Sequence, residues 1–78
     1  MQILYLYDLK AKNKREFNRV KRVFYYHLAK LALPKTAFIT KSTIVVEGNQ
    51  ERIMDFFFKR FKKSVTIYKV CCESIEEL

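Results

Sequence analysis

The chain opens with Met1-Gln2-Ile3-Leu4-Tyr5-Leu6-Tyr7-Asp8, an apolar, β-prone run that stops at a carboxylate. Residues 3–7 are nearly all apolar, which is typical of a central strand covered on both faces. Because successive side chains of a strand point to opposite faces, Leu4 and Leu6 share one face and Tyr5 and Tyr7 share the other. We therefore expect this strand at the centre of the fold.

Two later stretches carry apolar residues at the spacing of an amphipathic helix. The first begins at Asn13, where Glu16 three residues later indicates a capping box, and its end is set by Pro34. Its expected apolar face consists of Phe17, Val20, Phe24, Leu28 and Leu31. The second spans residues 51–63, and its expected apolar face consists of Ile53, Met54, Phe57, Phe58 and Phe61.

Short β-branched segments fill the rest of the chain. Residues 36–39 and 43–47 flank Thr40-Lys41-Ser42, which predicts a hairpin, and residues 64–70 predict a last strand. The order β-α-β-β-α-β is that of the ferredoxin-like arrangement. The sequence thus predicts an α+β fold as one domain over residues 1–78, with a four-stranded antiparallel sheet, both helices on one face, and a short acidic tail from about residue 73.

Helices on one face leave the other face of the sheet open. We expect Tyr5 and Tyr7 either in the core or in dimer contacts. If they point to the open face together with Phe38 or Tyr68, that face is too apolar to stay exposed on a monomer. A chain of 78 residues also buries only a modest share of its surface, so self-association would help to stabilise it. These considerations predict a homodimer.

Charge is distributed unevenly along the chain. There are 16 basic and 8 acidic residues, for a net charge of +8, and three of the acids lie in the last six residues. Residues 1–72 therefore carry 16 basic and 5 acidic groups, or +11. This balance predicts a polyanion or an acidic protein surface as partner. Lysine-rich decoration that raises stability, as in heat-adapted proteins, is the alternative interpretation.

The first helix carries most of the candidate nucleic-acid-binding residues. Arg15, Arg19 and Arg22 form one stripe, and Lys14 and Lys21 flank it. Cations that neutralise phosphates give affinity without sequence preference. A second cluster ends the second helix and comprises Lys59, Arg60, Lys62 and Lys63. For this second cluster, an interaction with the helix dipole is an equally good explanation.

Asp8 is the candidate catalytic and metal-binding residue. A carboxylate at a strand end beside a basic surface suits a magnesium ion and a phosphodiester. A single carboxylate binds Mg²⁺ weakly, because that ion keeps most of its waters and usually needs a second carboxylate or phosphates. A symmetry-related Asp8 across a dimer axis would supply the second acid.

Other chemistries find little support in the sequence. One glycine in the chain cannot build a glycine-rich phosphate loop, and His27 has no identifiable paired nucleophile. Base stacking on Tyr5 and Tyr7 would resemble RNA-recognition domains, but the Lys/Arg-Gly-aromatic run of those domains is missing from residues 43–48.

Cysteine usage and hydropathy indicate the compartment. The adjacent Cys71 and Cys72 point to opposite faces of a strand, so they do not form a ligand pair, and reduced thiols are the plain interpretation. No apolar run approaches the roughly 20 residues that span a bilayer, and the start of the chain does not resemble a signal peptide. We expect a soluble, cytoplasmic protein.

Three stretches together resemble the CRISPR-associated Cas-two family. They are the strand end Tyr7-Asp8-Leu9, the basic helix over residues 14–24, and the last strand Val65-Thr66-Ile67-Tyr68-Lys69-Val70. The resemblance covers nearly the whole chain. It implies a ferredoxin-like homodimer, with two sheets packed face to face and the two Asp8 carboxylates near the dimer axis.

The resemblance also implies a function. Members of this family are described as Mg²⁺-dependent endonucleases of RNA or DNA, and as the central dimer of the complex that integrates new spacers together with the Cas-one integrase. Double-stranded DNA or RNA would be the bound polymer. The sequence departs from the family at residues 35–40, where members carry a Gln-x-Ser-Val-Phe-Glu-Gly type run. A stand-alone basic RNA-binding module, or a toxin-like ribonuclease outside any CRISPR system, is the alternative.

Overall fold

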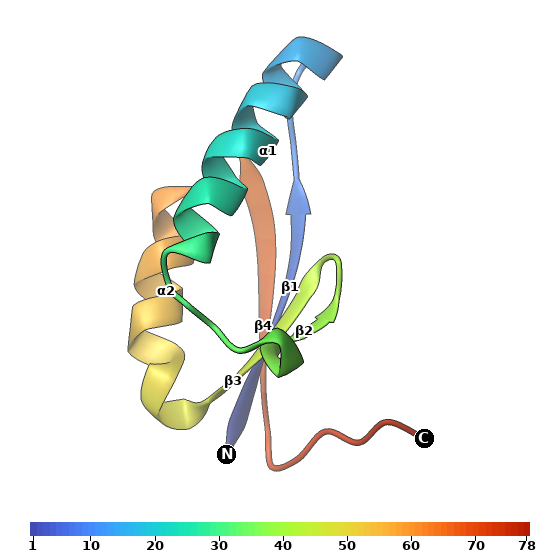
Figure 1. Cartoon of the computed structure of the whole chain (residues 1–78), viewed down its shortest axis with the longest axis vertical. Helices are drawn as coiled ribbons and strands as arrows, with labels where there is room; N and C mark the ends of the chain where they lie inside the picture. Colours follow the sequence, from blue (N-terminus) through green and yellow to red (C-terminus); the bar gives the residue numbers. More distant parts are fainter.

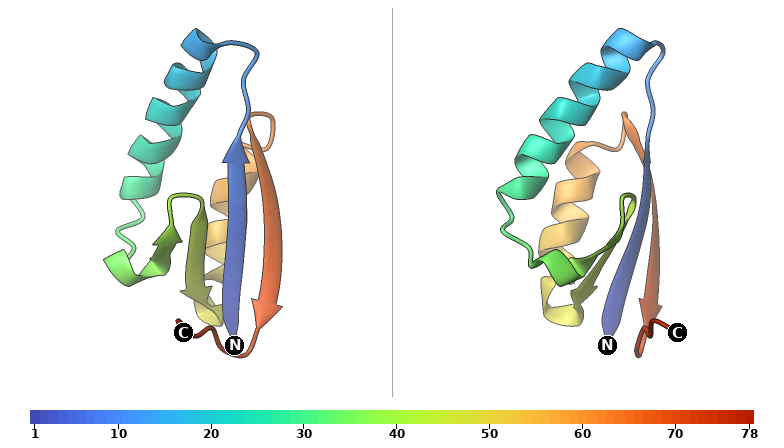
Figure 2. Two further views of the ribbon diagram at one scale, coloured as in Figure 1. Left: turned by 90° about the vertical axis from the view of Figure 1, so that its right-hand side faces the viewer. Right: turned by 45° about the vertical axis from the view of Figure 1, so that its right-hand side comes forward.

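The computed structural model describes residues 1–78 and builds a four-stranded sheet with two α-helices. The elements are β1 (Gln2–Leu9), α1 (Lys14–Ala29), β2 (Phe38–Thr40), β3 (Thr43–Glu47), α2 (Glu51–Arg60) and β4 (Val65–Cys72). All paired strands are antiparallel, in the order β2-β3-β1-β4, and both helices lie on one face (Figures 1 and 2). This architecture confirms the α+β expectation and is compatible with the ferredoxin-like arrangement.

β1 occupies the centre of the sheet, as its continuous apolar sequence predicted. It pairs with β4 over its full length, from Gln2 opposite Cys72 to Leu9 opposite Val65. Its pairing with β3 is shorter and stops at Leu6 opposite Thr43. The last residues of β1 therefore have a neighbouring strand on one side only.

Tyr5 and Tyr7 point toward the helices and form the middle of the core. Their side chains are 1% and 4% exposed. The Tyr5 ring stacks on Phe58 at 5.0 Å between centroids, and the Tyr7 ring lies 5.4 Å from Phe24. Of the two alternatives for these tyrosines, burial in the core is therefore correct, and the expectation that they could make the open face of the sheet apolar is wrong.

Each buried tyrosine hydroxyl has a partner. The Tyr5 hydroxyl donates to Oδ1 of Asp55 at 2.7 Å and to the backbone carbonyl of Glu51 at 3.2 Å. The Tyr7 hydroxyl donates to the backbone carbonyl of Lys41 at 3.1 Å. Burial raises the pKa of both tyrosines, and the hydrogen bond to Asp55 raises the pKa of Tyr5 further. Both hydroxyls thus remain neutral donors.

Lys69 joins this network from β4 and links it to α2. Its ammonium lies 2.9 Å from Oδ2 of Asp55 and 2.7 Å from Oε2 of Glu51, and these hydrogen bonds raise the pKa of Lys69. Burial alone would raise the pKa of Asp55, but the hydrogen bonds from Tyr5 and Lys69 outweigh it and hold that pKa below its usual value. The network therefore connects β1, β4 and α2 through one aspartate.

The start of α1 confirms the capping prediction with one difference. Oδ1 of Asn13 accepts a hydrogen bond from the backbone N–H of Glu16 at 2.8 Å. Glu16 does reach back, but its carboxylate accepts from the N–H of Lys12 at 3.0 Å rather than from Asn13. Both bonds satisfy backbone donors at the helix start or just before it, where the helix itself supplies no acceptor.

The expected apolar face of α1 is buried over only half of its length. Phe24 and Leu28 are buried, whereas Phe17 is 36% exposed. The helix begins beyond the ends of the strands (Figure 1), so its first turns have no sheet beneath them. It also ends at Ala29, earlier than Pro34 suggested, in a turn where Ala32 adopts a left-handed φ of 53°.

Three other boundaries differ from the sequence expectation. β2 is confined to Phe38–Thr40, because Lys35–Ala37 forms a 3₁₀ turn instead of extended chain. α2 ends at Arg60, and β4 continues to Cys72. Within α2, Ile53 is 58% exposed, so its assignment to the apolar face was wrong. Neither helix combines the length and apolarity that crossing a membrane requires.

The Asp55 network predicts a dependence of stability on pH. Because the pKa of Asp55 is depressed in the fold, its contribution is present above the unfolded value of 3.8 and is lost as the pH falls through the folded value. Asp55→Asn should lower the free energy of unfolding at pH 7 by about 1–2 kcal/mol. This deficit should shrink as the pH falls below 3.8.

Urea denaturation of both proteins across this pH range would measure the effect. Glu73→Gln is the matched control, because the Glu73 carboxylate is exposed in the tail and forms no hydrogen bond or ion pair within the chain. Its unfolding free energy should stay within about 0.5 kcal/mol of wild type. Equal deficits for the two variants at every pH would refute the role assigned to Asp55.

Candidate nucleic-acid interface

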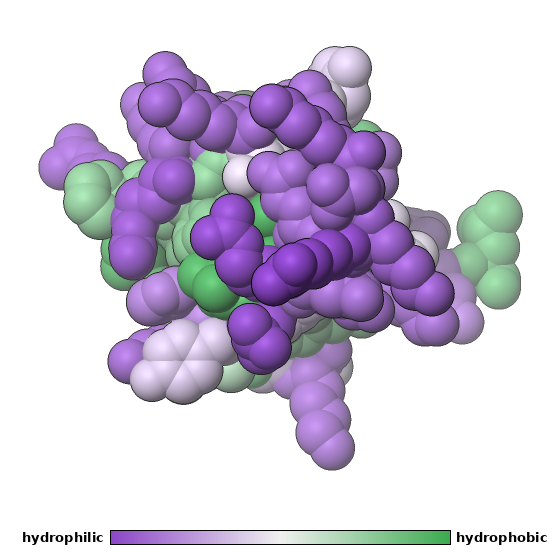
Figure 3. Space-filling model, turned by 90° about the horizontal axis from the view of Figure 1, so that it is seen from above, coloured by the Kyte–Doolittle hydropathy of each residue, from purple (hydrophilic) through white to green (hydrophobic).

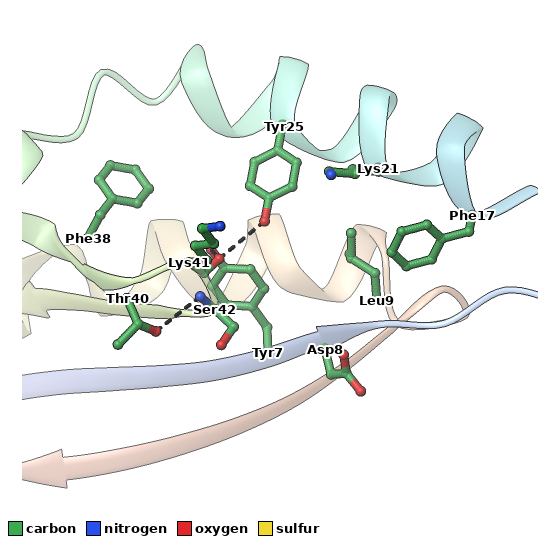
Figure 4. A pocket seen from close by; sticks show the side chains of 10 residues that line it. All are labelled: Tyr7, Asp8, Leu9, Phe17, Lys21, Tyr25, Phe38, Thr40, Lys41 and Ser42. Atoms are coloured by element: carbon green, nitrogen blue, oxygen red, sulfur yellow. Dashed lines mark hydrogen bonds between the residues drawn. The ribbon is translucent and has the colours of Figure 1, made fainter. Parts of the chain in front are cut away.

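Asp8 lies near the end of β1 on the open face of the sheet. It pairs with Thr66 of β4, beyond the point where the pairing with β3 stops. Its exposed side chain points away from the helix layer, to the opposite side of β1 from Tyr7 and Leu9 (Figure 4). A shallow hollow of about 130 Å³ joins it to Thr66 and Tyr68. Asp8 is thus free to meet a ligand or a second molecule.

One chain alone does not provide a metal site around Asp8. No three residues among the histidines, cysteines, aspartates and glutamates come together in a way that could hold a metal ion. A lone carboxylate leaves Mg²⁺ dependent on water, phosphate oxygens or a second acid for its remaining ligands. The residues of a single chain therefore do not fit a resident metal, and Asp8 fits one only where another molecule contributes ligands.

The arginine stripe of α1 is confirmed as one surface. Arg15, Arg19 and Arg22 together line a shallow hollow of about 720 Å³, beside the amides of Asn13 and Asn18. None of the three forms an ion pair, because the only ion pairs in the structure are those of Lys69. Glu16 also borders the hollow, but its carboxylate is held by the N–H of Lys12.

The two flanking lysines do not share that hollow. Lys14 is exposed and does not line it, and Lys21 lies on the other flank of α1, facing the β2–β3 hairpin. Figure 3, which views the end where α1 begins, shows mainly hydrophilic side chains with apolar ones in between. The second cluster, Lys59, Arg60, Lys62 and Lys63, is exposed at the end of α2 and in the turn that follows.

The open face of the sheet carries apolar residues other than the tyrosines of β1. The register places Leu6 beside Tyr68, and Leu4 beside Val70 and Val45. Tyr68, Val70 and Leu6 are 66%, 42% and 39% exposed. Ile75 of the tail borders a hollow at the β2 edge of this face. Tyr68, which the sequence offered as a possible residue of this face, does lie on it, and the alternation of β4 places Val70 on the same side.

A groove that was not predicted from the sequence lies on the inner flank of α1. It has a volume of about 800 Å³ and is lined by aromatic rings from α1 and β2, with Lys21 and Lys41 at its sides. The spacing of Phe17, Lys21 and Tyr25 at intervals of four was the available signal, because such residues share one helix face.

Comparisons with protein-family models, with curated proteins and with solved structures find no match to this chain. The chain is an α+β protein in which two helices cover one face of the sheet and the other face is open. The basic side chains of α1 form no ion pairs. The arginine stripe, the open face and Asp8 are therefore the candidate functional features of the chain.

Proposed function

We propose that this protein is a homodimer that binds double-stranded nucleic acid. The observation that carries the proposal is the arginine stripe of α1, in which Arg15, Arg19 and Arg22 gather in one hollow without a single ion pair. Guanidinium groups that lack protein partners are available to phosphate oxygens, which they match in geometry. Phosphate neutralisation releases counterions and gives strong binding without reading the bases.

The charge of the whole chain supports a polyanion as the partner. The net charge is +8, and residues 1–72 hold 16 basic groups against 5 acidic ones. Two of those five acids, Glu51 and Asp55, are already engaged by Lys69. Few acidic side chains are therefore left to neutralise the remaining cations. The resulting positive electrostatic field attracts anionic polymers at a distance.

Dimerisation through the open face is the second part of the proposal. Leu6, Val70 and Tyr68 are each more than a third exposed on that face, next to the partly buried Leu4 and Val45. A contiguous apolar patch on a small protein marks an interaction surface. A two-fold contact through this face would pair the same apolar patch of both chains, and a two-fold axis that passes near the end of β1 would bring the two Asp8 carboxylates together.

Phosphodiester hydrolysis is proposed for this dimer only. Two Asp8 carboxylates and the phosphates of a bound strand would provide the oxygen ligands that a single chain lacks for Mg²⁺. The metal would stabilise the charge that develops on the phosphate and activate a water. Within this proposal the protein acts as members of the Cas-two family do, with the Cas-one integrase as its partner in spacer acquisition.

The dimer interface predicts the effect of a charge at position 68. Tyr68→Glu should raise the dimer dissociation constant by about thirtyfold or more, because a desolvated aromatic anchor at an interface is worth about 2 kcal/mol. Tyr26→Glu is the matched control, since Tyr26 is 59% exposed on α1. Sedimentation equilibrium would measure both. A wild-type protein that stays monomeric at micromolar concentration would contradict the interface.

Salt dependence tests the arginine stripe. Replacing Arg15, Arg19 and Arg22 with Ala removes about six phosphate contacts from a symmetric dimer, so the log-log salt slope of duplex binding should become shallower by about five units. Fluorescence anisotropy over a salt series would measure the slope. The control replaces Lys59, Arg60 and Lys62 with Ala. If the control changes the slope and the arginine variant does not, the duplex binds at the end of α2.

Substitution of Asp8 should affect cleavage and duplex binding differently. Asp8→Asn should abolish any Mg²⁺-dependent cleavage, whereas duplex affinity should equal or slightly exceed that of wild type, because a negative charge near phosphates is removed. Cleavage of labelled RNA and DNA duplexes by both proteins, with and without Mg²⁺, is the measurement. Cleavage by the variant at the wild-type rate would show that hydrolysis does not depend on Asp8. Cleavage of RNA alone would favour the ribonuclease alternative.

A further inference from the structure

The groove between α1 and the β2–β3 hairpin is a second surface with its own chemistry. Its volume of about 800 Å³ lies within the range of small-molecule and cofactor sites. Leu9 lies at its floor, and Phe17, Tyr25 and Phe38 line it along its length (Figure 4). Its Phe17 end lies beside the first turns of α1, which extend past the strands (Figure 1).

Three aromatic rings of this groove are accessible and arranged in a row. Phe17, Tyr25 and Phe38 are 36%, 37% and 39% exposed, and Figure 4 shows them following one another from the start of α1 to β2. Tyr25 is fixed in place, because its hydroxyl donates to the carbonyl of Lys41 at 3.2 Å and its ring meets Phe24 edge-on at 5.2 Å. At least this ring of the groove is therefore held in position before any ligand binds.

The charge in the groove is positive. Lys21 and Lys41 line it, both are exposed, and neither forms an ion pair. Asp8 is the only acid among the lining residues, and its carboxylate lies on the other side of β1 (Figure 4). The hydroxyls of Thr40 and Ser42 add polar groups along the hairpin. A ligand of this groove must therefore combine flat apolar surfaces with negative charge.

We propose that the groove binds a single-stranded segment of nucleic acid, with bases stacked on the three rings and phosphates beside Lys21 and Lys41. Stacking platforms lined by cations are the means by which proteins hold unpaired strands without reading sequence. The proposal rests on the proposed function in that both invoke a polyanion. The two proposals differ in the part of the nucleic acid that is bound. The arginine stripe contacts the phosphate backbone of a duplex, whereas the groove contacts the exposed base faces of a single strand.

Two features favour this ligand over an acidic peptide or a duplex. Aliphatic side chains would bind the apolar side chains of a peptide equally well, whereas this groove is lined by aromatic rings, on which bases can stack. In a duplex the base faces are already stacked on one another and are not accessible to protein rings. Lys21 and Arg22 are adjacent in α1 but line hollows on its two flanks, so a strand that leaves a duplex end on the arginine stripe reaches the groove by crossing the helix.

The experiment compares single-stranded and duplex binding in the full chain. The probes are a fluorescein-labelled oligothymidylate, an abasic oligonucleotide of equal length, and a duplex, measured by anisotropy at one salt concentration. Phe17→Ala and Phe38→Ala should each weaken oligothymidylate binding about 5- to 150-fold, which is the range expected for one lost stack. Duplex affinity should stay unchanged. The wild-type protein should bind the abasic strand more weakly than oligothymidylate.

Matched variants separate loss of a ring from loss of the fold. Phe17→Leu keeps the apolar bulk and removes the ring, so it should weaken single-strand binding while the melting temperature stays close to wild type. Phe56→Ala removes an exposed phenylalanine of α2, 70% exposed and outside the groove, and should leave oligothymidylate binding unchanged.

Other results would contradict single-strand binding by the groove, or would separate it from duplex binding by the arginine stripe. Oligothymidylate binding at the wild-type level in both groove variants, or equal affinity for the abasic strand, would overturn it. If the groove variants instead lose binding of a polyglutamate peptide, the groove takes acidic protein segments. If the triple arginine variant binds duplex as wild type does while the groove variants lose single-strand binding, the arginine stripe is not the duplex-binding surface and the groove assignment stands.

Discussion

The packing of Tyr5 and Tyr7 against the aromatic layer of the helices is the constraint on which the rest of the structure depends. Tyr5 stacks on Phe58 and donates to Asp55, while Tyr7 lies between Phe24 and Phe58. Because side chains alternate along a strand, this choice commits every other residue of β1 to the opposite face. A shift of one residue would bury Asp8 and expose both tyrosines.

This alternation explains how so small a chain holds two distinct surfaces. The core takes the tyrosines with their hydroxyls satisfied, so Leu4, Leu6 and Asp8 remain on the open face beside Val70 and Tyr68. On the other side of the sheet, α1 is anchored by Phe24 and Leu28 near its end, and its first turns project past the strands. That projection presents the arginine stripe outward and leaves the aromatic groove inward.

Much of the fold could be read from the sequence, because its elements rest on local signals. The capping residues at Asn13, the continuous apolar, β-prone run of β1 and the helical spacing of α2 predicted the order and type of the elements. The face on which Tyr5 and Tyr7 lie could not be predicted, since a strand with apolar residues on both sides has no distinguishing pattern. The groove lined by Phe17 was missed for a related reason: helical periodicity identifies an apolar stripe but not whether a sheet lies beneath it.

The central claim is that the open face joins two copies of the chain and brings the ends of their β1 strands together. The most direct measurement is the distance between spin labels attached at position 8 in Asp8→Cys, with Cys71 and Cys72 replaced by serine. The account predicts one dominant separation, well below the 38 Å length of a single chain. Absence of dipolar coupling, or a separation longer than 38 Å, would contradict it.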